Sequence, residues 1–240
     1  MLLTRKVSGY RVVVLACLLT TGAQTFALAQ AGDPVESDDP GWEALFDGKS
    51  LKGWRANADP KSFRVVDGTI RAHAQGKKLS HLFYVGDKKK GFVAFKDFEL
   101  ELKARSEPNS NSGIFIHTDM SLRPPRRYLD RGYEIQLNSS TEEKKKTGSL
   151  YAIVNLSTSP VDETDWFKVN VRVQGKRITI AINDKVVVNY TEPENPIREV
   201  SRKGRVLKSK GGAIALQAHD PGSIFYFKDI RIRSFTEDDK

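Results

Sequence analysis

Two polar side chains alternate with apolar ones in the short segment GYEIQL. Tyr133, Ile135 and Leu137 fall on one side of a period of two, and Glu134 and Gln136 fall on the other. This pattern predicts a strand with one buried face and one polar face. A carboxylate and a carboxamide can hydrogen-bond the hydroxyl groups of a sugar, and the carboxylate can also transfer a proton.

Other segments carry groups of the same kinds. His117 ends GIFIH on the opposite side from Ile114 and Ile116, while Gln217 and His219 share one side of AIALQAH. If these strands pair in one sheet, we expect a single solvent-facing surface of ionisable and amide groups, formed by His117, Glu134, Gln136, Tyr151, Gln217 and His219. Trp166, beside Asp165 at the start of a strand, is either a packing residue or a platform for a sugar ring.

The carboxylates do not form the pattern of a conventional glycosidase. Such enzymes place two carboxyl groups about 5 to 10 Å apart, and Glu134 has no E-x-D-x-x-E companion in the sequence. No cofactor is predicted. A divalent metal ion on His117, Glu134 and His219 is an alternative by ligand type alone, because no local spacing motif supports it.

The segments that must position these residues read as short strands separated by turns. Alternating apolar residues mark strands in 98–105, 113–117, 133–137, 149–154, 167–190, 213–219 and 223–235. We find no long helical period, no phosphate-binding glycine loop and no fixed repeat. The pattern predicts one all-β sandwich or barrel, with two long basic loops, 118–131 and 191–212, at the rim of a binding face.

The first residues have the layout of a secretory signal peptide. Arg5, Lys6 and Arg11 precede the apolar run VVVLACLL, and ALAQ offers small residues for cleavage after Ala29. We therefore predict a signal peptide over 1–29, a flexible polar leader over 30–41 and one domain over 42–236, exported to the periplasm or beyond. The apolar run is too short to span a bilayer comfortably, since this needs roughly 20 apolar residues, so no stable membrane span is predicted after cleavage.

The charge and cysteine content narrow the functional classes. The only cysteine, Cys17, lies in the predicted signal peptide, so the mature protein would have no disulfide, thiolate ligand or cysteine nucleophile. The 240-residue chain has 39 Lys and Arg against 30 Asp and Glu, and the excess lies in short clusters typical of solvated loops. Together with export, this argues against nucleic acid as a partner.

Several motifs in a fixed order resemble a known family. LFDGKSLKGW, DFELELKAR, NSGIFIH, GYEIQL, TGSLY, ALQAHDPGS and FKDIRI together resemble the 3-keto-disaccharide hydrolase domain family, long catalogued as a domain of unknown function. The resemblance runs from about Trp42 to Phe235. It implies a concanavalin A-like jelly-roll sandwich of two antiparallel sheets, in a protein exported by bacteria.

The resemblance also implies a reaction and a set of residues. Members act on sugars already oxidised to a ketone at C3, where a base can remove the C2 proton, the enolate expels the C1 substituent, and water then adds. Carried onto this chain, the catalytic candidates are Glu134, His219 and His117, and the substrate-binding candidates are Asn111, Gln136, Tyr151 and Gln217, with Trp166 added from its sequence context. Many members have Arg where His117 stands here.

The sequence is consistent with two main functional classes and, third, with a structural envelope protein that uses its basic loops. The first is a glycoside hydrolase or lyase that acts on 3-keto-glycosides. The second is a carbohydrate-binding module without catalysis, because a sandwich fold does not determine function. The cluster of ionisable groups on one face favours the enzyme, since a pure binding module would depend more on aromatic stacking.

Overall fold

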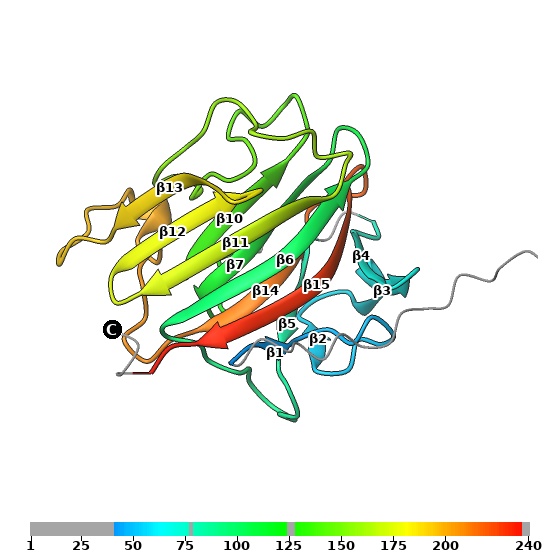
Figure 1. Cartoon of the computed structure of the whole chain (residues 1–240), viewed down its shortest axis with the longest axis horizontal. Helices are drawn as coiled ribbons and strands as arrows, with labels where there is room; N and C mark the ends of the chain where they lie inside the picture. Colours follow the sequence, from blue (N-terminus) through cyan, green and yellow to red (C-terminus); the bar gives the residue numbers. More distant parts are fainter. Residues whose placement is uncertain (1–40, 77–78, 124–127, 237–240) are drawn as a thin grey trace, which may run out of the picture. The chain divides into compact units, whose positions relative to one another are not determined.

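The computed structural model describes residues 41–76, 79–123 and 128–236. The predicted signal peptide, and the predicted leader apart from Gly41, lie outside the described residues. Within them, antiparallel strands form an eight-stranded sheet, here the large sheet, and a five-stranded sheet, here the small sheet (Figure 1). The prediction of an all-β sandwich of two antiparallel sheets is confirmed.

The strands have the following bounds. The large sheet contains β1 (Glu43–Ala44), β3 (Phe63–Val66), β4 (Thr69–His73), β6 (Phe98–Ser106), β11 (Phe167–Gln174), β12 (Arg177–Ile182), β13 (Lys185–Thr191) and β15 (Ile224–Ser234). The small sheet has the order β10 (Tyr133–Asn138), β7 (Asn111–Thr118), β14 (Ala213–Ala218), β5 (Ser80–Tyr84) and β2 (Trp54–Ala56). A separate hairpin pairs β8 (Leu122–Arg123) with β9 (Tyr128–Leu129), and the short 3-10 helices are η1 (Pro60–Ser62) and η2 (Val200–Arg202).

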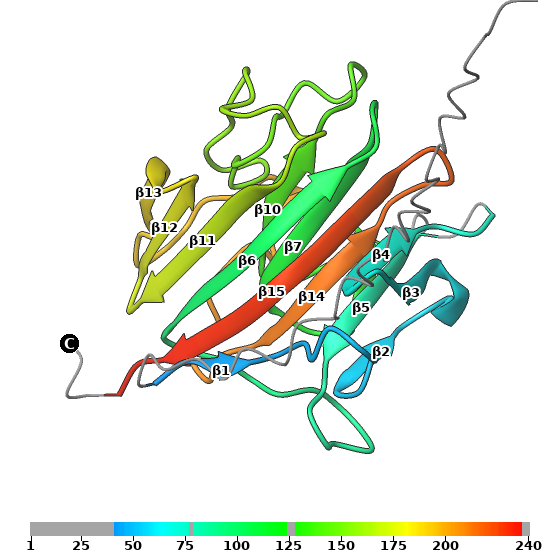
Figure 2. The same ribbon diagram turned by 45° about the vertical axis from the view of Figure 1, so that its right-hand side comes forward.

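The core lies between the two sheets, and strands of the large sheet such as β6 and β15 lie in front of small-sheet strands such as β7 and β14 (Figure 2). The alternating apolar residues of each strand point into it, for example Leu100 and Leu102 from β6, and Ile135 and Leu137 from β10. These side chains are at most 1% exposed. Burial of each such side chain contributes about 1.5 to 3 kcal/mol, and it also sets which residues of β10 face outward.

The outer face of the small sheet, away from this core, has an apolar part and a polar part. Phe83, Phe115 and Ala215 form a second, smaller apolar cluster there, and Leu122 and Leu129 of the β8–β9 hairpin pack against it. The hairpin therefore covers the apolar part. The hairpin does not cover the polar side chains of β10 or those at one end of β7 and β14. Other loops border this polar part.

One predicted strand is not a strand. The segment SLYAIV forms a tight turn, in which Leu150 bridges to both Ile135 and Val154 and the amide of Tyr151 donates to the carbonyl of Glu134 at 2.9 Å. Alternation alone did not reveal this turn. Ala152, with φ of 63°, occupies a left-handed conformation that breaks the extended chain.

Gly132 fixes where β10 begins. Its φ is 75°, and a Cβ atom at this position would lie 2.3 Å from the carbonyl oxygen of Ile116. Only glycine combines this backbone conformation with so close an approach of two strands. Gly175, in the turn between β11 and β12, has a φ of 57° but nothing within 4 Å of a built Cβ.

We predict that Gly132→Ala lowers the free energy of unfolding by about 3 to 5 kcal/mol, because left-handed strain and overpacking act together. Gly175→Ala should cost only the conformational strain, about 1 to 2 kcal/mol. Urea unfolding of both variants measures the difference. Equal losses would show that the contact with β7 does not constrain the start of β10.

Candidate active site

A cavity of about 680 Å³ lies over the polar part of the small sheet's outer face. Its floor carries Asn111 of β7, Glu134 and Gln136 of β10, and Gln217 of β14, with His219 directly after β14. The two long basic loops also line it, as the sequence predicts: Arg123 and Tyr128 come from one, and Arg202 and Arg205 from the other.

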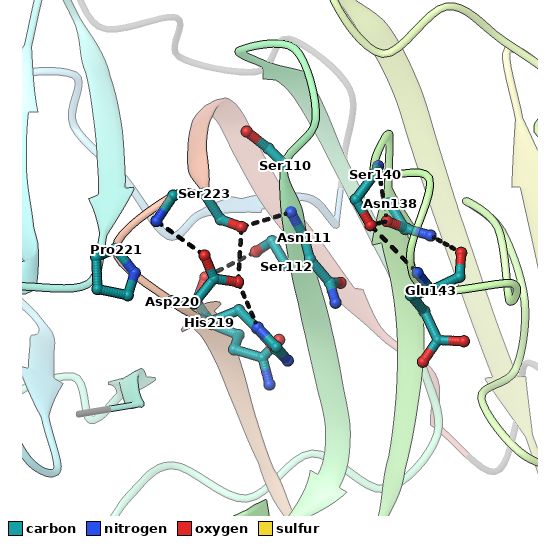
Figure 3. A network of polar contacts seen from close by, with 12 residues as sticks. Ser110, Asn111, Ser112, Asn138, Ser140, Glu143, His219, Asp220, Pro221 and Ser223 are labelled. Carbon is teal, nitrogen blue, oxygen red and sulfur yellow. Dashed lines mark hydrogen bonds and ion pairs between the residues drawn. The ribbon is translucent and has the colours of Figure 1, made fainter. Parts of the chain in front are cut away.

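His219 is held by the residue that follows it. The Nδ1 atom of His219 lies 2.7 Å from Oδ2 of Asp220, and the same oxygen accepts a hydrogen bond of 2.9 Å from the Ser223 hydroxyl (Figure 3). The hydrogen bond with His219 is the largest cause that holds the pKa of Asp220 below its usual value. Ionised Asp220 can only accept a hydrogen bond, so Nδ1 of His219 carries the proton that it donates. In neutral His219 the Nε2 atom therefore carries the free lone pair.

The turn that holds Asp220 is anchored to the neighbouring strand. The backbone amide of Asn111 donates to the Ser223 hydroxyl at 2.8 Å, and the amide of Gly222 donates to Oδ1 of Asp220 at 2.9 Å (Figure 3). The Ser112 hydroxyl donates to the carbonyl of Gln217 at 2.7 Å. These bonds fix the end of β14, and with it the imidazole, against β7.

A second network of polar side chains, around Asn138 and Glu143, lies at the Tyr151 side of the cavity. Asn138, at the end of β10, accepts from the Ser140 hydroxyl at 2.7 Å and donates to the carbonyl of Glu143 at 2.7 Å (Figure 3). The carboxylate of Glu143 then accepts from the Tyr151 hydroxyl at 3.0 Å and from the amide of Lys145 at 3.0 Å. Tyr151 therefore lines the cavity from a turn, with its hydroxyl already oriented.

Glu134 is a buried carboxylate paired with a buried guanidinium. Nη2 of Arg205 donates to Oε2 of Glu134 at 3.1 Å, and Nη1 donates to the carbonyl of Gly132 at 3.2 Å. Burial raises the pKa of Glu134 above its ordinary value, whereas the charge of Arg205 opposes this shift. Gly113 on β7, the register partner of Gln136, leaves space for the Glu134 side chain, since a Cβ there would lie 3.0 Å from Oε1 of Glu134.

The amide groups on the floor have different partners. Nε2 of Gln136 donates to Oδ1 of Asn111 at 3.1 Å, which orients both side chains. Nε2 of Gln217 lies 3.4 Å from Nε2 of His81, a fully buried side chain on β5. Oε1 of Gln217 and Nδ1 of His81 have no hydrogen-bond partner among the described residues.

His117 does not share this face, and the prediction that it does is wrong. Its φ is 51°, next to a register shift between β14 and β7, and the two irregularities turn the ring toward Phe98 of the large sheet. Nε2 of His117 donates to the carbonyl of Lys96 at 2.8 Å, and Nδ1 accepts from the amide of Lys208 at 3.0 Å. Burial lowers the pKa of His117, so the ring is a neutral structural group.

Trp166 also lies elsewhere, so its predicted role as a sugar platform at this site is not supported. Its ring contacts the cation of Lys228 at 4.3 Å and that of Arg105 at 5.6 Å, both on the outer face of the large sheet. The sequence places Trp166 at a strand start but does not say to which sheet the strand belongs.

The metal alternative needed His117, Glu134 and His219 together, and His117 is absent from the cavity. In the part of the chain that the structure describes, no group of three or more His, Cys, Asp or Glu side chains is arranged to hold a metal ion. No helix among the described residues is long and apolar enough to cross a membrane.

Several residues of the site were missed in the sequence. Asp220 directly follows His219 in the motif HDPGS, and this adjacency was a usable signal. The sequence placed the basic segment 191–212 at the rim but did not single out Arg202 or Arg205 within it, and Glu143 gave no signal, because the path of each segment depends on the folded sheet.

The structure defines a two-sheet sandwich protein with a cavity lined by ionisable groups on one sheet, and comparisons with known proteins agree on the fold. A crystal structure of a Parabacteroides distasonis protein assigned to the glycosyl hydrolases is similar, with a TM-score of 0.65 and 21% identity over 82% of this chain and 94% of that one. A carbohydrate-binding module from Bacillus subtilis has a TM-score of 0.51 at 12% identity, over 76% of this chain and 96% of the module. These likenesses concern the fold, which is the predicted concanavalin-like sandwich.

The family follows from the sequence match. The model of the 3-keto-alpha-glucoside-1,2-lyase-like domain matches residues 41–233, and the chain belongs to this family. A curated relative, the 3-keto-disaccharide hydrolase of Bacteroides thetaiotaomicron, is 24% identical over 238 residues, covering 83% of this chain and 80% of the relative. The predicted family resemblance is confirmed.

Buried His81 makes the stability of the fold depend on pH. Burial is the largest cause that lowers the pKa of His81 from 6.5 to about 3. Between these values the unfolded chain binds a proton that the folded chain does not, so this group's contribution to stability is present above pH 6.5 and is lost as the pH falls.

We predict that His81→Gln flattens the pH dependence of the unfolding free energy between pH 6 and 5 by about 1.4 kcal/mol per pH unit. Glutamine keeps a polar neighbour for Gln217 but cannot titrate. Chemical unfolding at both pH values measures the slope in wild type and variant. Identical slopes would contradict the assignment of a neutral, buried His81.

Proposed function

We propose that the protein is a carbohydrate-active enzyme that cleaves glycosidic bonds of sugars oxidised to a ketone at C3. The observation that carries this proposal is the arrangement of the Asp220-backed imidazole of His219 and the buried carboxylate of Glu134 along one cavity. Family membership and the named activity of the Bacteroides thetaiotaomicron relative support the substrate class.

The chemistry uses an acidified C–H bond. The C3 ketone makes the C2 proton acidic, and Nε2 of His219 removes it to form an enolate. The enolate expels the C1 substituent, whose oxygen takes a proton from an acid, and water then adds across the enone at C1. The net result is hydrolysis of the glycosidic bond. Asp220, rather than Glu134, orients the imidazole and stabilises its protonated form.

Glu134 takes the second acid/base role. Burial raises the pKa of Glu134 although Arg205 opposes this shift, so the carboxylate takes up a proton more readily than an exposed one and can pass it to the leaving oxygen. Asn111, Gln136 and Gln217 supply amide groups for the ketone oxygen and the ring hydroxyls, and Oε1 of Gln217 is unpaired among the described residues. The Tyr151 hydroxyl completes the polar wall.

The proposal includes export. Support comes from the basic and apolar residues that begin the sequence and from the cleavage pattern at Ala27 to Gln30. Carbohydrate is the proposed partner. The alternative function is a binding module without catalysis, which shares the fold. In that case loss of His219 would change only the affinity for the carbohydrate.

The first experiment compares two substrates that differ only at C3. Purified protein is incubated with 4-nitrophenyl 3-keto-glucoside and with 4-nitrophenyl glucoside, each in both anomeric forms, with and without EDTA. We expect nitrophenol release from a keto substrate alone. Binding of the glucosides without release from any of them would favour the binding module, and loss of release with EDTA would indicate a metal requirement that we do not propose.

The second experiment assigns roles within the site. We predict that His219→Gln lowers kcat by about 10² to 10⁴, the usual contribution of a general base, and that Glu134→Gln also lowers it. Glu101→Gln, on the outer face of the large sheet, is the matched carboxylate control and should retain activity.

His117→Gln tests which of the two histidines predicted from the sequence, His117 or His219, is catalytic. Because His117 lies outside the cavity, the folded fraction of this variant should keep activity on the keto substrate. Full activity of both His219→Gln and Glu134→Gln would refute the proposed roles.

A further inference from the structure

Three guanidinium groups gather on one wall of the cavity. They belong to Arg123 on β8, Arg202 at the end of η2, and Arg205 just beyond it. Arg205 has a carboxylate partner in Glu134. Neither Arg123 nor Arg202 forms an ion pair with a carboxylate of the described residues.

The two unpaired arginines are nevertheless held in place. Nη1 of Arg123 donates to the carbonyl of Ser201, and the guanidinium of Arg123 lies 5.8 Å from the ring centre of Tyr128. The guanidinium of Arg202 lies 5.2 Å from the ring centre of Tyr151. Backbone and aromatic contacts orient these groups without neutralising their charge.

Two of the other carboxylates that line the cavity already have partners. Glu143 accepts from Tyr151 and Lys145, and Asp220 accepts from His219 and Ser223. The other acidic residue at the cavity, Glu142, is exposed. Arg123 and Arg202 are therefore the guanidinium groups at the cavity without a carboxylate partner among the described residues, and a negative group on a ligand would be attracted to them.

The positive wall extends beyond the cavity. Arg202 also borders a neighbouring hollow of about 790 Å³, whose charged lining comprises Lys145, Arg198, Arg202 and the single acidic residue Glu199. A ligand that extended from the cavity past Arg202 would place its outer sugar unit in this hollow. Its outer unit would meet mainly positive charge.

We infer that the substrate carries an anionic group on the sugar unit next to the oxidised ring, and that Arg123 and Arg202 bind this group. A uronic acid carboxylate is the chemistry that suits the planar guanidinium fork, and a sulfate ester offers the same charge. This inference rests on the proposed function, because it places the oxidised ring at His219.

The test measures binding of unoxidised disaccharides, so that it does not depend on turnover. Calorimetry compares α- and β-linked disaccharides of two glucose units with the same compounds carrying a C6 carboxylate or a C6 sulfate on either ring. We expect an acidic member to bind about tenfold more tightly than its neutral counterpart, through charge-assisted hydrogen bonds. The preference should weaken as salt is added.

Variants identify the binding groups. Arg202→Gln and Arg123→Gln should each remove most of the preference for the acidic compound and leave the neutral one unchanged, whereas Arg202→Lys should retain part of it. Arg64→Gln, exposed on β3 of the large sheet, is the control and should have no effect. Comparison of carboxylate with sulfate shows which group the site selects.

The outcomes separate this inference from the proposed function. Equal affinity for acidic and neutral compounds, no detectable binding of any acidic one, or a preference that survives both glutamine variants would overturn it. If the neutral keto-glucoside were nevertheless cleaved, the proposed reaction would stand. An Arg202-dependent preference without cleavage of any keto substrate would instead support the acidic ligand and refute the reaction.

Discussion

The buried ion pair between Arg205 and Glu134 joins the long loop after β13 to the small sheet, and the site depends on it. Each charge alone would cost several kcal/mol at this depth, so neither group is stable there without the other. Arg205 also binds the carbonyl of Gly132, where the chain turns into β10. The floor of the cavity and the loop that covers it therefore form together, and the position of Glu134 is set by a residue 71 positions away.

The outer face of the small sheet shows how one strand can serve two purposes. On β7, Phe115 packs beneath the β8–β9 hairpin, while Asn111, at the other end of the same face, meets Gln136 in the cavity. On β14, Ala215 and Gln217 make the same division. The apolar part anchors the loops, and the loops then bring charged residues over the polar part. The site therefore combines polar groups fixed on a rigid sheet with charged residues supplied by the surrounding loops.

Alternation in the sequence predicted the faces of the regular strands, because a buried core permits only one register for residues such as Ile135 and Leu216. It correctly grouped Glu134, Gln136, Gln217 and His219. It failed at His117, where a positive φ and a register shift reverse the side chain. Trp166, which its sequence context left as either a packing residue or a sugar platform, lies beside the other sheet. Arg205 could not be predicted, since its contact depends on the path of a loop and not on a local period.

The polar groups beneath the cavity favour chemistry over simple binding. A binding surface can rely on exposed aromatic rings and solvated amides, which cost the fold little. Here a carboxylate, a guanidinium and an imidazole are buried, and buried atoms of His81 and Gln217 lack hydrogen-bond partners among the described residues. Such groups destabilise a fold by about 1 to 3 kcal/mol each when they are left unpaired. A site that carries this cost gains dipoles and proton carriers whose positions are fixed before the ligand arrives, and fixed charges of this kind matter most where charge develops during a reaction.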